Sequence, residues 1–207
     1  MHTPTWVLVD VEPIAAEHKY TFYKPSLAAI AKIKPGENVK LIFRFESEEA
    51  DAPEAERMWV IVDTIEADGQ FTGRLDNHPQ WIKDLKAGDT IAFCTCHIIG
   101  TEHAETDNLV ERYAKRCFVT QRILRDRARV AYLYREEPDN DDDSGWRFMA
   151  NDETQEYMDA KGNVQYVSVG RVLSCDDAFV SLLGSGEGTA FVLDVASNTF
   201  LPMARDA

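Results

Sequence analysis

Apolar and polar residues alternate along much of the N-terminal part of the chain. Between residues 38 and 46 every second position is apolar, from Val39 to Phe45, while Lys40 and Arg44 fall on the opposite side. This period of two is typical of a strand with one buried face. The same pattern, together with β-branched and aromatic content, predicts strands at 5–10, 38–46, 57–66, 71–75 and 90–99.

Helical spacing and turn residues separate these strands. Ser26 is a suitable N-cap for a short helix whose apolar positions run from Leu27 to Ile33. The turn at 67–69 joins two strands into a hairpin, and residues 80–85 are expected to form about one helical turn. Together these elements predict a small curved sheet or half-open barrel with short helices.

The C-terminal part has a similar texture but is not a repeat of the first. Strands are predicted at 117–119, 128–134, 146–149, 164–173, 189–195 and 199–203. Helices are predicted at 107–115 and 152–160, with a short one after Asp176. The fold class is therefore α+β, and the second sheet is expected to be mainly antiparallel, with two or three short helices. We place one α+β domain at 1–106, a linker helix at 107–116 and a second domain at 117–207.

Charge narrows the classes of partner. The 207 residues contain 22 basic and 36 acidic residues, giving a net charge of −14. Such a balance argues against nucleic acid and against anionic membrane surfaces, and it suits a basic partner. No basic segment followed by a long apolar run opens the chain, and no apolar stretch is long enough to cross a bilayer, so we expect a cytoplasmic protein.

The cysteines raise the question of a metal site. Cys94, Cys96 and His97 are close in sequence, but there is no second cysteine pair with the usual zinc spacing. On a strand the two cysteines would share one face, and His97 would point to the other. We therefore expect reduced thiols buried in a strand, and no metal site.

Other motifs give no catalytic chemistry. The segment 139–150 begins like a calcium loop but has Ser144 and Ala150 where glycine and glutamate are required. The glycine-rich segment 184–188 lacks the lysine of a phosphate-binding loop, and no serine occupies a G-x-S-x-G turn. We expect no enzyme activity, no catalytic residue and no cofactor, with a hydrolase assembled from distant residues as the residual alternative.

Two dense polar–aromatic segments flank the acidic loop that precedes Trp146. Arginine and tryptophan are frequent anchors of protein interfaces. The candidate binding residues are Tyr134, Arg135, Glu136, Asp143, Ser144, Trp146, Arg147 and Glu153. The structural alternative is that Arg135 or Arg147 pairs with Asp143 or Glu153 and only holds the loop in place.

The same segments carry a family resemblance. Residues 115–205 resemble the bacterial immunity-protein 33 family. The matching positions are the strand 117–119, the Tyr134-to-Asp139 segment, the D-S-G-W-R-F core at 143–148, Asp152-Glu153 and Tyr157. Asn151 stands where that family usually has glycine. The resemblance implies a protein that binds and neutralises a cognate protein toxin. A basic toxin would suit the acidic chain.

Residues 20–100 resemble a second bacterial family, the domain of unknown function 2314. The matching positions are Gly36, 39–41, 56–60, the F-x-G-x-L-x-N-x-P run from Phe71, Gly88-Asp89 and Ile98. They are strand and turn residues, which imply a fold but no chemistry. An alternative function is therefore a small-ligand or regulatory module, with a barrel lined by Trp59, Phe71 and Trp81.

Overall fold

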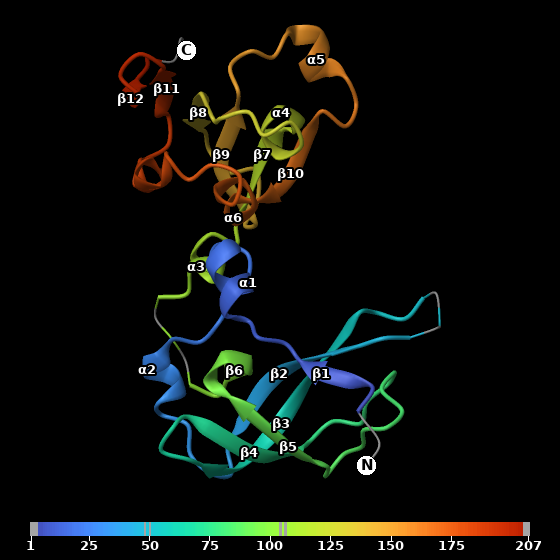
Figure 1. Ribbon diagram of the computed structural model, residues 1–207. Coiled ribbons are helices and arrows are strands. Elements are labelled where there is room, and N and C mark those ends of the chain that lie inside the picture. Colours follow the sequence, from blue (N-terminus) through green and yellow to red (C-terminus); the bar gives the residue numbers. More distant parts are fainter. Residues whose placement is uncertain (1–3, 48, 50, 104, 106, 205–207) are drawn as a thin grey trace. The chain divides into compact units, whose positions relative to one another are not determined.

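The computed structural model describes residues 4–47, 49, 51–103, 105 and 107–204. The chain divides into two compact units, Met1–His18 with Phe22–Asn108, and Lys19–Thr21 with Leu109–Ala207. Within the described residues, each unit contains one six-stranded sheet and its own apolar core. Figure 1 labels the helices and strands of each unit. Among the described residues, no helix has the length and apolar character that a membrane span requires.

The first unit is built around a strongly curved sheet. Its strands are β1 (Trp6–Leu8), β2 (Asn38–Phe45), β3 (Ala55–Ile65), β4 (Gln70–Leu75), β5 (Thr90–Cys94) and β6 (Ile98–Thr101). Its helices are α1 (Glu12–Glu17), α2 (Leu27–Ile30) and the 3₁₀ turn η1 (Thr95–His97). Ser26 caps α2 as predicted, because its hydroxyl accepts a hydrogen bond from the Ala29 amide at 3.1 Å.

Strand β2 is the strand at which this sheet nearly closes. One edge of β2 pairs with β3, and the other edge pairs with β6 at residues 39–41 and with β1 at residues 43–45. Since β3, β4 and β5 follow in order, and η1 links β5 directly to β6, the strands form an almost complete ring. The predicted half-open barrel is thereby confirmed. Its interior is filled by alternate residues of β2 to β5, including Leu41, Phe43 and Phe93.

Two local predictions in the first unit are wrong. The segment 90–99 is not one strand, because the 3₁₀ turn at Thr95–His97 separates β5 from β6 and redirects the chain toward β2. Residues 80–85 form bends and a turn in place of a helical turn. At 95–97 the chain turns into its pairing with β2, and at 80–81 the backbone amides of Gln80 and Trp81 donate to the Glu56 carboxylate.

The second unit has a mixed sheet in the order β10-β7-β9-β8-β11-β12. Its strands are β7 (Arg116–Thr120), β8 (Tyr132–Arg135), β9 (Asp143–Met149), β10 (Val164–Ser168), β11 (Ala190–Asp194) and β12 (Thr199–Pro202). In the part of this unit that the structure describes, only the pairing of β7 with β9 is parallel, so the prediction of a mainly antiparallel sheet is confirmed. The predicted C-terminal hairpin is formed by β11 and β12.

Short helices complete the second unit. They are α3 (Leu109–Arg112), α4 (Gln121–Leu124), α5 (Gln155–Asp159), α6 (Val169–Leu173) and the 3₁₀ helix η2 (Val180–Gly184). The prediction of one strand over 164–173 is wrong in its second half, because β10 ends at Ser168 and residues 169–173 form α6. The Ser168 hydroxyl accepts from the Arg171 amide at 3.2 Å and starts a helix whose side chains enter the core. Gly170 is required there, because a Cβ atom would lie 2.4 Å from the Tyr20 carbonyl oxygen.

Candidate functional site

The candidate residues lie mainly on the β8–β9 hairpin of the second unit, on both sides of its loop. Tyr134 and Arg135 end β8, and the D-S-G-W-R stretch opens β9. Because alternate strand residues point to opposite faces, the set is divided. Arg135, Ser144 and Trp146 line one cavity, whereas Tyr134, Glu136 and Arg147 line another.

A buried ion pair holds the hairpin. Arg147 donates to both carboxylate oxygens of Asp143, at 2.9 and 2.8 Å, and its Nε donates to Glu136 at 2.6 Å. Asp143 is only 1% exposed and Arg147 only 5%. The Arg147 guanidinium lowers the pKa of Asp143 to about 2, against the opposing effect of burial. Both groups are therefore charged at neutral pH, and the structural alternative proposed for Arg147 holds with Asp143 as its partner.

The backbone of the loop is tied to the same carboxylate. The Asp143 side chain accepts hydrogen bonds from the amides of Asp139 at 3.1 Å and Gly145 at 3.0 Å. Gly145 has φ +78°, and a Cβ atom there would lie 2.2 Å from the carbonyl oxygen of Glu136. The aspartate, glycine and arginine of the D-S-G-W-R-F core thus fix the conformation of the loop.

The loop itself is acidic and faces solvent. Residues 136–142 join β8 to β9 and contain no basic residue. The exposed side chains are those of Glu137, Asp139, Asn140, Asp141 and Asp142. Of these, Asp139 also reaches the buried Arg147 guanidinium at 3.6 Å. The loop therefore exposes negatively charged side chains, while the buried Asp143–Arg147 pair holds its backbone in place.

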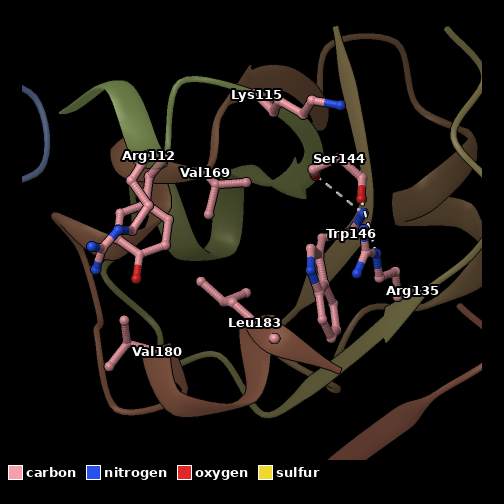
Figure 2. A pocket seen from close by; sticks show the side chains of 10 residues that line it. Arg112, Lys115, Arg135, Ser144, Trp146, Val169, Val180 and Leu183 are labelled. Carbon is pink, nitrogen blue, oxygen red and sulfur yellow. Dashed lines mark hydrogen bonds between the residues drawn. The ribbon is translucent and has the colours of Figure 1, made fainter. Parts of the chain in front are cut away.

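A cavity of about 330 Å³ lies on one face of the hairpin (Figure 2). Its apolar wall includes Trp146, Val169 and Leu183, and its cationic side chains are Arg112, Lys115 and Arg135. The Arg135 guanidinium donates to the carbonyl oxygens of Ser144 at 3.2 Å and Ser185 at 2.7 Å. It thus connects the hairpin to the turn after η2.

An aromatic and cationic row crosses the other face of the sheet. The register places Tyr166, Phe118, Arg147 and Tyr134 side by side on four neighbouring strands. The Arg147 guanidinium lies 4.7 Å from the centre of the Phe118 ring, and Phe118 lies 4.9 Å from Tyr166. A cavity of about 260 Å³ next to this row is lined in part by Tyr134, Glu136 and Met158.

Burial changes the interpretation of several candidate residues. Trp146 is only 2% exposed and belongs to the core of the second unit, where it stacks on Phe148 at 6.1 Å. Asp143, Ser144 and Arg147 are buried as well. The expectation that these side chains are exposed anchors is therefore wrong, because β9 is covered on both faces.

The Glu153 side chain also makes hydrogen bonds within the second unit. Its carboxylate accepts from the Thr120 hydroxyl at 2.5 Å and from the Ala150 amide at 2.8 Å. This ties the segment after β9 to the end of β7. Asn151, which stands at the position usually held by glycine, adopts φ +64°, a conformation that asparagine tolerates better than most residues.

The sequence pattern did not single out Arg112, Lys115 or Leu183 as site residues. They are far from the hairpin in sequence, and the fold brings them to its cavity. The sequence does contain a run of basic residues between Arg112 and Arg129, which could have indicated a cationic site. The pattern alone did not show which of these residues would lie near Trp146.

The residues expected to line a ligand site in the first unit do not share a face. Phe71 is 3% exposed and stacks on Phe93 at 5.2 Å inside the core. Trp59 lies between Met58 and Val60, which are core residues, so its ring points to the outer side, where the Lys40 ammonium lies 5.2 Å from its centre. The barrel lining by Trp59, Phe71 and Trp81 is therefore wrong.

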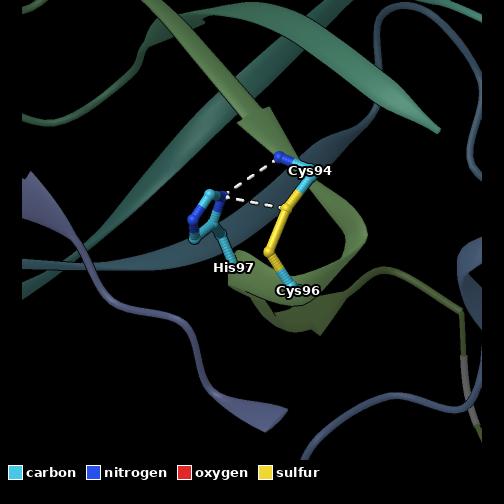
Figure 3. A group of neighbouring side chains, drawn as sticks. All are labelled: Cys94, Cys96 and His97. Carbon is cyan, nitrogen blue, oxygen red and sulfur yellow. Dashed lines mark hydrogen bonds between the residues drawn. A yellow bond between two sulfur atoms is a disulfide. The ribbon is translucent and has the colours of Figure 1, made fainter. Parts of the chain in front are cut away.

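A second cluster with potential chemistry lies in the turn between β5 and β6 (Figure 3). Cys94 and Cys96 are joined by a disulfide, and His97 turns back so that its Nδ1 is 3.4 Å from Cys94 Sγ. All three residues are partly exposed. The expectation of reduced cysteines buried in a strand is wrong for this pair, because their sulfur atoms are bonded, both residues are partly exposed, and Cys96 lies in η1 beyond the end of β5.

The fold and the site define a two-unit β-rich protein whose second unit carries an acidic hairpin held by a buried ion pair. The chain belongs to the family described as "Uncharacterized protein conserved in bacteria (DUF2314)", whose model matches residues 15–123, just over half of the 207 residues. The model described as "Immunity protein Imm33 domain" matches residues 117–203. Both resemblances inferred from the sequence are thereby confirmed. No curated protein and no solved structure matches the chain.

Proposed function

We propose that the second unit is a non-enzymatic immunity module that neutralises a protein toxin by binding it. The match to the immunity-protein domain supports this class of function. The observation that carries the proposal is the acidic β8–β9 loop, whose exposed carboxylates are supported by the buried Asp143–Arg147 pair. We place the contact at the loop and not at Trp146, because the indole belongs to the core.

The chemistry of the loop favours a basic partner. Glu137, Asp141 and Asp142 are exposed, and no lysine or arginine within 136–142 neutralises them. A preorganised loop loses little conformational entropy on binding, and its charge raises the rate of encounter with a positive surface. A toxin that acts on nucleic acid would present such a surface.

The test compares two variants with equal loss of charge. The loop variant carries Glu137→Gln, Asp141→Asn and Asp142→Asn, and the control carries Asp51→Asn, Glu54→Gln and Glu66→Gln at exposed positions of the first unit. Each tagged protein is expressed at native level in its host, and co-purifying proteins are quantified by mass spectrometry. We expect one stoichiometric basic partner with the wild type and the control, and its loss with the loop variant.

Other outcomes would count against this proposal. A partner that both variants retain equally would show that the loop is not part of the interface. If no partner is enriched under competition or stress, the alternative of a small-ligand module gains support. The cavity beside Trp146, with Arg112, Lys115 and Arg135 around an apolar wall, would then be the place to screen carboxylates that carry an apolar group.

A further inference from the structure

The turn that closes the barrel of the first unit brings three metal-ligating side chains together. Cys94 ends β5, and Cys96 and His97 lie in η1. One ligand atom from each of the three lies within 4.8 Å of the others. The 3₁₀ turn is the cause, because a continuous strand would have pointed His97 away from both cysteines.

We propose that this turn, once its disulfide is reduced, is a binding site for a thiophilic cation of the zinc type. The ligands would be the two thiolates and the Nδ1 atom of His97. Two thiolates with one imidazole select zinc over the hard cations magnesium and calcium. The disulfide and the metal-bound form would be alternative states of the same turn.

One hydrogen bond shows which nitrogen of His97 is unprotonated. The Cys94 amide donates to Nδ1 of His97 at 3.0 Å, and a backbone amide can only donate. Nδ1 of the neutral ring is therefore unprotonated, and its single lone pair accepts the Cys94 amide, which a cation bound at Nδ1 would displace.

The backbone geometry also suits coordination. The Cα atoms of Cys94 and Cys96 are 5.3 Å apart. Around a tetrahedral zinc ion with bonds of about 2.3 Å, two sulfur atoms lie roughly 3.7 Å apart, a separation that side-chain rotation can reach from these Cα positions. The Cys96 carbonyl oxygen accepts the Val11 amide at 2.9 Å, which helps to hold the turn in place.

The interconversion is a balanced two-electron step. The thiolate of a dithiol reductant attacks one sulfur of the Cys94–Cys96 bond and forms a mixed disulfide, and its second thiol then displaces the protein. Cys94 and Cys96 leave as thiols, and the reductant becomes a disulfide. Binding of Zn²⁺ then releases the two thiol protons. The partial exposure of the turn allows access by both reagents, and the fourth coordination position is left for water.

Cobalt substitution tests the site in the full chain. The protein is reduced with a phosphine, freed of reductant under anaerobic conditions and titrated with Co²⁺. We expect one equivalent to produce sulfur-to-cobalt charge-transfer bands that Zn²⁺ abolishes, and no bands with the oxidised protein. Cys96→Ser should remove the bands. His97→Ala should weaken binding roughly tenfold or more, whereas His18→Ala, at an exposed histidine, should have no effect.

A second measurement needs no variant. The reduced wild type is alkylated with and without Zn²⁺, and each cysteine is quantified by peptide mass spectrometry. We expect Zn²⁺ to protect Cys94 and Cys96, while the partly exposed Cys175 reacts equally in both samples and the buried Cys117 reacts in neither. Absence of both cobalt bands and zinc protection would overturn the proposal, as would bands that persist in Cys96→Ser.

Discussion

Arg147 and Asp143 illustrate how single residues acquire their roles from their surroundings. Both belong to the D-S-G-W-R-F core, and both are buried and joined by two hydrogen bonds. The Arg147 guanidinium also contacts Glu136, the first residue of the loop, and Asp139, near its middle. The D-S-G-W-R-F core therefore supports the loop from its buried side.

We expect Asp143→Asn to destabilise the protein by about 3–5 kcal/mol, because it leaves the Arg147 charge buried without its main partner. Asp152→Asn is the matched control. It breaks the exposed Arg122–Asp152 pair, at 2.6 Å, and should cost at most about 1 kcal/mol. Chemical denaturation followed by circular dichroism measures both. Equal effects of the two variants would contradict the support role of the buried pair.

The same pair predicts a pH dependence. The pKa of Asp143 is lowered from 3.8 to about 2 in the folded protein by the Arg147 guanidinium. A lowered carboxyl pKa contributes stability that is complete above pH 3.8 and is lost as the pH falls toward 2. The contribution is about 2 kcal/mol. We expect the free energy of unfolding to fall less steeply between pH 4 and pH 2 in Asp143→Asn than in the wild type.

At the scale of elements, the β8–β9 hairpin depends on one backbone position. Gly145 combines φ +78° with a close approach to the Glu136 carbonyl, so any Cβ atom there requires the loop to move. We expect Gly145→Ala to cost about 2 kcal/mol or more. Gly186→Ala, where nothing lies within 4 Å of an added Cβ, should change stability by less than about 0.5 kcal/mol. A Gly145→Ala protein as stable as the wild type would show that the loop can relax.

At the scale of the whole molecule, the net charge of −14 affects encounter rates. Association with the proposed basic partner should slow as salt is raised, because screening shortens the range of attraction. Stopped-flow measurements at low and physiological ionic strength test this. The loop variant should associate on the order of tenfold more slowly at low salt, and the control variant should change much less. Rates that do not depend on salt would exclude electrostatic steering.

Local patterns were sufficient for much of this protein. The alternation from Val39 to Phe45 predicted β2, the Ser26 cap predicted α2, and the turn at 67–69 predicted the β3–β4 hairpin. Both family resemblances were also visible in the sequence. The three elements each depend on residues within a few positions of one another, so periodicity and turn chemistry predict them without knowledge of the rest of the chain.

Only the tertiary structure decided where these elements meet and which side chains they cover. In the folded protein Trp146 is buried, and residues 169–173, predicted as the end of a strand, form α6. Arg112 and Lys115 lie at the cavity beside the hairpin. The tertiary structure also ended β5 at Cys94, so that His97 faces the cysteines. These features depend on contacts between segments far apart in sequence, in which closure of the sheet and burial of apolar surface outweigh local preference.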